Sequence, residues 1–184
     1  MSRDYPTEIA GPYEAPPRSF VDDADSEVEL RRYGDDDFEA VVEMYTAFDP
    51  ADRAQGIPPT GESDIREWLE SLTDDGVGVL ARHDGAVVGH AVLVPDRHGD
   101  FELAIFVLRA YQQASIGTGL LGALLGAGRE AGVERIWLTV ERWNAPAIAL
   151  YRKMGFEASD TDSFELEKAA EYVLAHASQP VLSV

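Results

Sequence analysis

Apolar residues follow two periods along most of this 184-residue chain. Apolar and polar residues alternate from Val28 to Tyr33, which predicts a strand, and two apolar runs follow at 77–82 and 86–94. The residues between these runs, His83-Asp84-Gly85, indicate a β-hairpin. Further strands are predicted at 101–107 and 135–140, and apolar residues three and four positions apart predict helices over 38–45, 65–72, 117–131 and 144–154.

The two ends of the chain lack this regularity. Residues 1–27 contain four prolines, many acidic residues and no apolar period, so we expect a flexible acidic N-terminal tail. Residues 28–168 form the predicted domain, with two short strands at 156–167, and residues 169–184 are expected to form a C-terminal helix and tail. The long Pro- and Gly-rich loop at 47–61 is a candidate lip of a substrate site.

The chain is strongly acidic, with a formal net charge of -19 and only two lysines, Lys153 and Lys168. No basic patch is visible, which argues against a nucleic-acid partner. Because acidic residues occur along the whole chain, we interpret the charge as a surface adapted to high salt and expect a halophilic microbial source. Attraction of a basic substrate is the alternative, although molar salt shortens the Debye length to about 3 Å and weakens such steering.

Residue types that bind metals or form disulfides are scarce. The chain has no cysteine, and its four histidines, His83, His90, His98 and His176, lack the spacing typical of a metal site. We therefore expect no metal. No segment is long and apolar enough to span a bilayer, and Met1–Phe20 has no apolar signal-peptide core. These features predict a cytoplasmic protein without a membrane partner.

A glycine-rich turn precedes the helix predicted at 117–131. Its residues are Ser115, Ile116, Gly117, Thr118, Gly119 and Leu120. Glycines let backbone amides approach a bound group, and the first turn of a helix has unpaired N–H groups and the positive end of the helix dipole. This combination is typical of a pyrophosphate site that needs no basic side chain.

The same glycines are also compatible with a dinucleotide site or with close packing alone. With Gly122 they spell the GxGxxG pattern of dinucleotide-binding proteins, and Glu141 lies about 20 residues further on, where a ribose-binding acid would be. In that fold the first glycine directly follows the strand, whereas here residues 108–115 intervene. Close packing accounts for Gly122, Ala123 and Gly126 better than it accounts for the turn itself.

A second signature follows the turn, with the spacing Asn-x-x-Ala-x-x-Leu-Tyr and then Gly-Phe: Asn144, Ala147, Leu150, Tyr151 and Gly155-Phe156. Together with the glycine turn and the order of predicted elements, it resembles the GNAT superfamily of N-acetyltransferases over roughly residues 28–168. The resemblance implies a mixed α/β (α+β) acyl-CoA N-acyltransferase fold, with a central, mostly antiparallel sheet flanked by helices.

The resemblance implies acetyl-CoA as the donor and a primary amine, on a small molecule or a protein, as the acceptor. Glu102 is the candidate general base, because many family members have a glutamate on the strand before the glycine turn; Asp100 is a weaker candidate. Tyr151 is the candidate general acid for the leaving thiolate, since its phenol donates a proton. Glu102 could instead point to solvent, and Tyr151 could be a packed aromatic beside Phe156.

The resemblance also implies where the donor binds. The pantetheine arm is expected to pair with the main chain of Ile105, Phe106 and Val107 between splayed strands, and the amides of 115–120 to hold the pyrophosphate. Asn144 is expected to contact the cofactor, to cap its helix, or to do both.

One departure from the family pattern concerns the turn. The usual Arg or Gln falls on Ala114, and a position that is commonly glycine falls on Ser115. Because the pyrophosphate contacts are largely made by backbone amides, this loss affects the expected affinity more than the location of the site. Gln112 and Gln113 could compensate.

Three functions therefore remain open. The leading one is an N-acetyltransferase, and the alternative is a non-catalytic acyl-CoA sensor, which Ala114 favours and the pair Glu102 and Tyr151 opposes. A dinucleotide-dependent oxidoreductase is the third. A homodimer is possible through exposed strand edges near the C-terminus.

Overall fold

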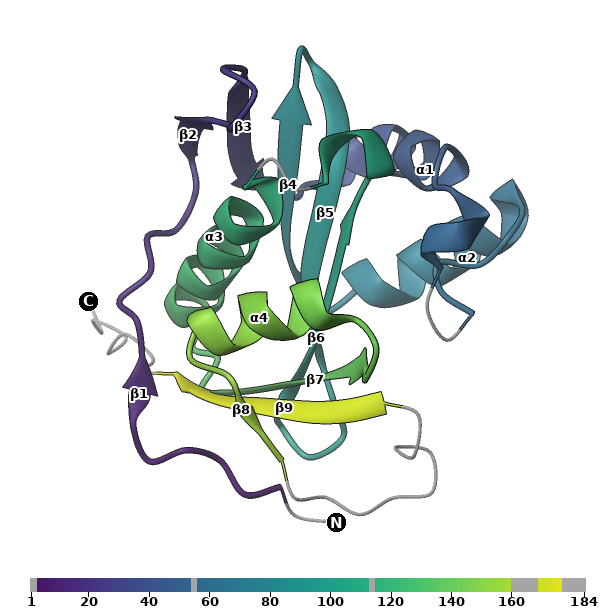
Figure 1. Cartoon of the computed structure of the whole chain (residues 1–184). Helices are drawn as coiled ribbons and strands as arrows, with labels where there is room; N and C mark the ends of the chain where they lie inside the picture. The colour runs from purple at the N-terminus through teal and green to yellow at the C-terminus, as the bar shows by residue number, and fades with distance from the viewer. Residues whose placement is uncertain (1–2, 54–55, 113–114, 160–168, 177–184) are drawn as a thin grey trace, which may run out of the picture.

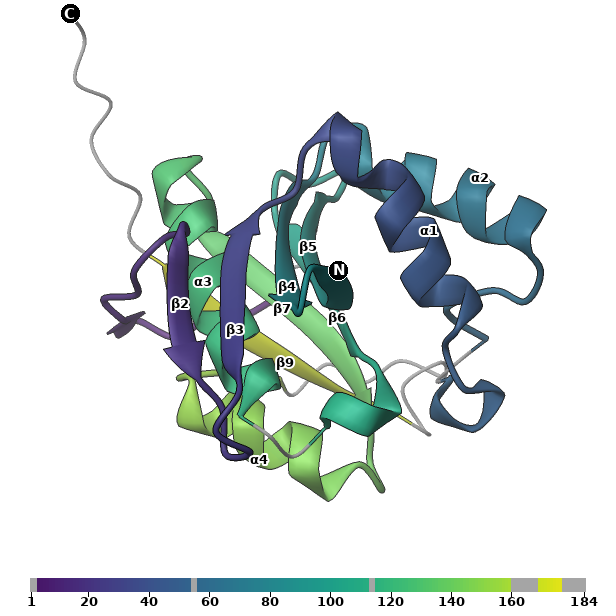
Figure 2. The ribbon, with the colours of Figure 1, turned by 90° about the horizontal axis from the view of Figure 1, so that it is seen from above.

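The computed structural model describes residues 3–53, 56–112, 115–159 and 169–176. Its sheet lies between two pairs of helices, with α1 and α2 on one face and α3 and α4 on the other (Figures 1 and 2). The α-helices are α1 (Phe38–Thr46), α2 (Glu62–Thr73), α3 (Ile116–Glu130) and α4 (Ala145–Lys153). The strands are β1 (Ile9–Ala10), β2 (Arg18–Val21), β3 (Glu27–Arg32), β4 (Val77–His83), β5 (Ala86–Pro95), β6 (Phe101–Val107), β7 (Arg135–Glu141), β8 (Glu157–Ala158) and β9 (Ala169–His176).

The sheet is mixed and mostly antiparallel, as predicted. The strand order in the described residues is β1-β9-β7-β6-β5-β4-β3-β2, with β8 beside β9, and only β6–β7 and β1–β9 are parallel pairs. The predicted hairpin is β4–β5, which closes at the pair His83 and Ala86. Antiparallel β4, β5 and β6 precede the glycine turn, which contradicts the parallel βαβ unit that a dinucleotide-binding fold requires.

The parallel pair β6–β7 is short. Its only registered pairs in the described residues are Phe101 with Ile136 and Glu102 with Trp137. Beyond this point the strands diverge, and β7 and β9 lie across the direction of β4–β6 (Figure 1). From Leu103 to Val107, β6 therefore pairs with β5 on one edge and with no described strand on the other.

Each face of the sheet has its own apolar core. The helices α1 and α2 pack through Val41, Tyr45, Ile65 and Leu69 onto the sheet residue Leu80. The helices α3 and α4 cover the other face, where the largest fully buried side chains include Ile116, Leu120, Leu121, Leu124, Leu125 and Ile136. Because apolar surface is buried on both faces, the central strands of the sheet are held firmly in place.

A buried hydrogen bond joins α1 to β5. The Tyr45 hydroxyl lies 2.7 Å from His90 Nδ1, and both side chains are completely buried. The rings of Trp68 and Phe106 contact Tyr45 edge-on at centroid distances of 5.0 and 5.4 Å. In this apolar setting the neutral imidazole is favoured, and burial lowers the pKa of His90 to about 4.

His90 should make the protein less stable in acid. The unfolded chain binds a proton at His90 near pH 6.5 and the folded chain only near pH 4, so stability present above pH 6.5 is lost as pH falls between these values. The loss should reach about 3 kcal/mol. Urea unfolding at about pH 7 and about pH 4.5 measures it.

The matched variant for this measurement is His90→Asn, whose amide oxygen can still accept the Tyr45 hydrogen bond. It should be less stable than the native chain at neutral pH but lose less stability on acidification. Since both chains carry the same carboxylates, an equal loss in both would contradict a role for His90.

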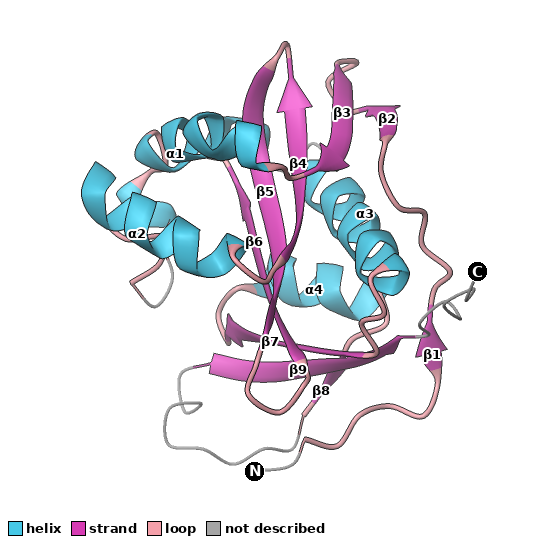
Figure 3. Cartoon of the chain, turned by 180° about the vertical axis from the view of Figure 1, so that it is seen from behind, coloured by secondary structure: helices cyan, strands magenta, loops and turns pink. Residues whose placement is uncertain are grey.

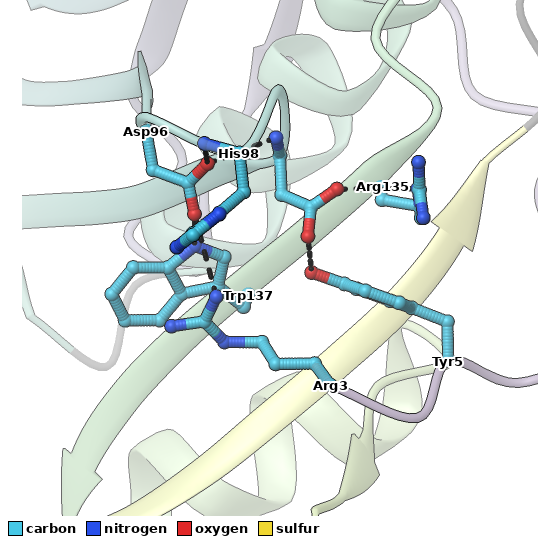
Figure 4. Close-up of polar contacts among 7 residues, drawn as sticks. Arg3, Tyr5, Asp96, His98, Arg135 and Trp137 are labelled. Carbon is cyan, nitrogen blue, oxygen red and sulfur yellow. Dashed lines mark hydrogen bonds and ion pairs between the residues drawn. The ribbon is translucent and has the colours of Figure 1, made fainter. Parts of the chain in front are cut away.

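The expectation of a flexible tail over residues 1–27 is wrong in its described part, residues 3–27. Strand β2 pairs with β3, strand β1 pairs with β9, and the segment runs past α3 between them (Figure 3). Tyr5 donates a 2.7 Å hydrogen bond to Asp100, and the Arg3 guanidinium lies 3.7 Å from the centroid of the Trp137 ring (Figure 4). Individual side chains, several of them aromatic, attach this segment to the domain. Because they are not regularly spaced, they leave no periodic apolar pattern in the sequence.

The small residues of α3 receive this N-terminal segment. A Cβ at Gly126 would lie 2.4 Å from the backbone of Glu14 and Ala15, and one at Gly119 would lie 2.7 Å from the Phe20 ring. The Tyr13 hydroxyl donates to the carbonyl of Met154 at the end of α4. Close packing therefore explains Gly126, as expected, but its partner is the N-terminal segment.

The C-terminal helix predicted over 169–184 is also wrong in its described part, because residues 169–176 form strand β9. Ala, Glu and Leu in this segment favour a helix, but pairing with β7 along Arg135–Glu141 outweighs that local preference. Leu174 is completely buried. The folded unit therefore extends beyond 28–168 at both ends. The predicted strands at 156–167 are described only as β8, since 160–168 lie outside the described residues.

Both edges of β9 are paired within the chain. Strand β7 occupies one edge, and β1 and β8 together occupy the other over Tyr172–His176. The exposed edge from which we expected a homodimer is therefore mostly covered, and the homodimer stays a prediction without that support.

Candidate active site

A cleft opens where β6 and β7 diverge, with a volume of about 240 Å³. One wall is β6 from Glu102 to Val107, and the opposite wall is β7 from Thr139 to Glu141. The remaining lining residues come from α4 with its cap and from connecting segments: Phe48, Asp52, Ile57, Gln112, Asn144 and Tyr151. The structure thus brings both predicted catalytic residues to one cleft.

Glu102 occupies the last register position before β6 and β7 separate. Its side chain is exposed and lines the cleft, so the carboxylate is in contact with water and would lie next to a ligand bound in the cleft. The weaker candidate, Asp100, is buried and is bound by Tyr5 at 2.7 Å and by Arg135 at 3.2 Å. These contacts give Asp100 a structural role at the β5–β6 turn.

Tyr151 lies on α4 and lines the cleft while only 7% of its surface is exposed. Its ring contacts Phe156 edge-on at a centroid distance of 5.7 Å. Burial raises the pKa of Tyr151 to about 12, because the phenolate would lose hydration. The side chain is therefore a packed aromatic and also a phenol that keeps its proton at neutral pH.

Asn144 lines the cleft and caps α4. Its side-chain oxygen accepts a 3.2 Å hydrogen bond from the amide of Ala147, which confirms the predicted N-cap. Pro146 in the first turn suits a helix start, because no intrahelical partner is available there for an amide proton. A contact of Asn144 with a cofactor stays a prediction.

Ile105, Phe106 and Val107 line the cleft, on the edge of β6 that pairs with no described strand. On the other edge these residues pair with β5, for example Phe106 with His90. The Gln112 amide donates a 3.0 Å hydrogen bond to the carbonyl of Val107. Gln112 is therefore tied to the end of β6, and Gln113 and Ala114 lie outside the described residues.

The glycine turn forms the start of α3. Ser115 is the N-cap with a left-handed φ of 63°, and the first helical hydrogen bond runs from the Gly119 amide to the Ser115 carbonyl. The helix itself therefore offers no acceptor to the amides of Ile116, Gly117 and Thr118. The side chains of Ile116 and Leu120 are buried in the core, so they can offer a ligand only their backbone. None of the residues 115–120 lines the cleft.

The two glycines of the turn, Gly117 and Gly119, differ in whether the fold itself requires glycine. A Cβ at Gly117 would make only an ordinary contact, 3.6 Å from Leu150, so the fold does not require glycine there. At position 119 the fold does require glycine, because a Cβ there would lie 2.7 Å from the Phe20 ring. Gly117 is therefore the position at which the lack of a side chain can serve the close approach of an anion.

The long loop over 47–61 reaches the cleft through Phe48, Asp52 and Ile57, in the position expected for a lip. Arg109, which follows β6, forms a bidentate ion pair with Asp52, with a shortest distance of 2.8 Å. Sequence reasoning missed this pair, because residues 57 positions apart in the chain give no local signal.

Asp23 is a second functional candidate that the sequence did not indicate. Its carboxylate accepts a 2.7 Å hydrogen bond from the Ser115 hydroxyl, and both side chains are exposed. An acidic side chain therefore lies at the positive end of α3, where an anion is favoured. The sequence did not indicate Asp23 because it lies within residues 1–27, which were predicted to be a flexible tail.

A model of the acetyltransferase (GNAT) family matches residues 38–156. An uncharacterised N-acetyltransferase of Mycobacterium tuberculosis is 35% identical over 101 residues, which are 54% of this chain and 65% of that protein. The L-amino acid N-acetyltransferase AaaT of Escherichia coli is 29% identical over 82% of this chain and 96% of that protein. The matched part is thus less than two thirds of the mycobacterial protein.

Among solved structures, yncA of Salmonella typhimurium, described with acetyl-CoA as its cofactor, has a TM-score of 0.64 at 18% identity. The match covers 85% of this chain and 98% of that one, and it supports the fold. Within the described residues, no helix is long and apolar enough to cross a bilayer, and no three His, Asp or Glu side chains are grouped to hold a metal ion.

Proposed function

We propose that this chain, which belongs to the GNAT acetyltransferase family, is an acyltransferase that transfers an acetyl group from acetyl-CoA to a primary amine in the cleft between β6 and β7. One observation carries this proposal. The cleft combines an edge of β6 that no described strand pairs with a carboxylate, Glu102, on one side and a protonated phenol, Tyr151, from another element.

The described residues fit the donor in two places. The edge of β6 at 105–107 that no described strand pairs offers backbone groups to the amides of a pantetheine arm, and the amides of 116–118 offer donors to a pyrophosphate. When bound, acetyl-CoA supplies an acyl thioester, whose C–S bond is replaced by the C–N bond of the product. The departures at Ala114 and Ser115 leave these backbone donors in place.

The two side chains would then move the protons. The carboxylate of Glu102 takes the proton of the incoming amine, directly or through a water molecule, so that the nitrogen can attack. The Tyr151 hydroxyl gives its proton to the departing thiolate. Burial disfavours the phenolate, so Tyr151 is reprotonated after each turnover. A primary ammonium loses two protons on acylation: the one taken by Glu102 before attack leaves to solvent, and the one lost from nitrogen after attack restores the Tyr151 hydroxyl.

Thiol release from acetyl-CoA, with and without a panel of primary amines, tests this proposal. Release that depends on an amine, together with an N-acetylated product in mass spectrometry, is the expected result. Binding of acetyl-CoA without a product from any amine would instead support the non-catalytic acyl-CoA sensor.

Asp23 leads to a prediction about donor affinity. Its carboxylate lies beside the amides proposed to hold the pyrophosphate, so removing the charge with Asp23→Asn should tighten acetyl-CoA binding. Because both groups are exposed and screened, the gain should be about two- to fivefold at low salt. Isothermal titration calorimetry measures it. Asp25→Asn, a neighbouring exposed acid, is the control, and an equal change in both variants would refute the effect.

The acidic surface leads to a prediction about salt. We propose a cytoplasmic enzyme of a salt-adapted microbe, in which self-repulsion at a net charge of -19 is relieved by screening. The melting temperature should therefore rise by several degrees between low and molar KCl. An unchanged melting temperature would count against salt adaptation.

A further inference from the structure

The charged side chains that line the cleft are all acidic in the described part of the chain: Asp52, Glu102 and Glu141. They come from three elements, so the negative charge surrounds the cleft and is not confined to one wall. Glu102 lies on β6 and Glu141 on β7, the two strands that diverge to form it. A cationic group that enters is attracted, and an anionic group is repelled.

Asp52 has a cationic partner outside the lining of the cleft. Asp52 is bound by Arg109 at 2.8 Å, and Arg109 also lies 3.5 Å from Asp49. Arg109 itself does not line the cleft, so its guanidinium is directed to acids of the loop. No described Lys, Arg or His belongs to the lining, and the described part of the cleft therefore offers no cationic side chain to a substrate carboxylate.

Two of the three residues by which the 47–61 loop lines the cleft, Phe48 and Ile57, are apolar. Phe48 is buried there. Ile57 is 41% exposed and is one of the few large apolar residues exposed in the described chain. An apolar group on the acceptor could cover Ile57, which would remove apolar surface from water.

From this arrangement we infer that the acceptor is a cationic primary amine with an apolar stem and no carboxylate on the carbon that bears the amine. This inference rests on the proposed function and specifies its substrate class. A free amino acid would have to place its carboxylate near Glu102 and Glu141 without a cation to pair with, and such like-charge contacts are the usual means of rejecting a wrong partner. The chain would then differ in acceptor from AaaT, whose name specifies L-amino acids.

The test compares 2-phenylethylamine with L-phenylalanine, which differ only in the carboxylate. The expected kcat/KM for the amine is at least about tenfold higher. The alkylamine holds its proton more tightly than the amino acid does, so at equal pH protonation works against this result. An N-terminal phenylalanine in a dipeptide amide, which also lacks the adjacent carboxylate, distinguishes a peptide acceptor from a small amine.

The variant Glu141→Gln assigns the selectivity to the cleft. It should lower the ratio of the two kcat/KM values, whereas Glu157→Gln, which removes an exposed acid of β8 outside the lining, should preserve the ratio. Equal or faster turnover of L-phenylalanine would overturn the inference and leave the proposed function standing. An unchanged ratio in Glu141→Gln would also overturn it. Acetyl-CoA binding without turnover of any acceptor would overturn both.

Discussion

Replacement of Tyr151 by phenylalanine should lower kcat by at least about 100-fold and leave the Kd for acetyl-CoA unchanged. The variant keeps the ring that packs on Phe156 and removes only the hydroxyl of a residue that lines the cleft. Without a proton donor the thiolate has to leave as an anion in a partly buried site, which raises the barrier to transfer. Thiol release gives kcat, and calorimetric titration gives Kd.

Tyr13→Phe is the matched control for this variant. It removes a hydroxyl that holds the end of α4 through the carbonyl of Met154 but does not line the cleft. If Tyr151→Phe retains full activity, Tyr151 is not the acid, and if both variants lose the same activity, the position of α4 is what matters. Because burial raises the pKa of Tyr151 to about 12, its proton should cause no loss of activity between neutral pH and about pH 10.

Gly117→Ala should weaken acetyl-CoA binding by about 10- to 100-fold, the equivalent of one or two lost charge-assisted hydrogen bonds to the pyrophosphate. The new Cβ meets only Leu150 at 3.6 Å, so the fold accepts it, and alanine favours a helix more than glycine does. The free energy of unfolding of the Gly117→Ala variant should therefore equal or exceed that of the native chain. Calorimetric titration and urea unfolding measure the two quantities.

Two other glycines of α3 serve as controls. Gly119→Ala should lower the free energy of unfolding by about 1–3 kcal/mol, because its Cβ would lie 2.7 Å from the Phe20 ring. Gly122→Ala, with its nearest contact at 3.7 Å, should change neither stability nor binding appreciably. Unaltered acetyl-CoA binding in Gly117→Ala would remove the turn from the donor site.

The middle of the fold could be predicted because its signals are local. A turn of the type His83-Asp84-Gly85 between two apolar runs specifies the β4–β5 hairpin, and the apolar stripe of α3 specifies a helix whose inner face is buried. The cap Asn144 likewise marked the start of α4 to within one residue.

The ends could not be predicted in this way, because tertiary contacts determine them. Tyr5, Tyr13 and Phe20 anchor the N-terminal segment one at a time, at spacings that match neither a strand nor a helix. In β9, residues that favour a helix are held in a strand by β7. Each element depends on partners that are distant in the sequence.

The candidate site divides in the same manner. A motif indicated Tyr151, and the order of elements indicated Glu102, and both lie at the cleft. The contacts of Asp52 with Arg109 and of Asp23 with Ser115 join segments that only the fold brings together. The charge balance of the cleft, and hence the acceptor class that we infer, depends on such contacts.

The most direct test of the proposed donor site is an NMR titration of the isotope-labelled chain with acetyl-CoA, because it reports where the donor binds. We predict that the largest changes in amide chemical shift occur at Ile105–Val107 and at Ile116–Gly119, the free edge of β6 and the start of α3. Shifts that concentrate elsewhere, or no shifts at saturating acetyl-CoA, would contradict it.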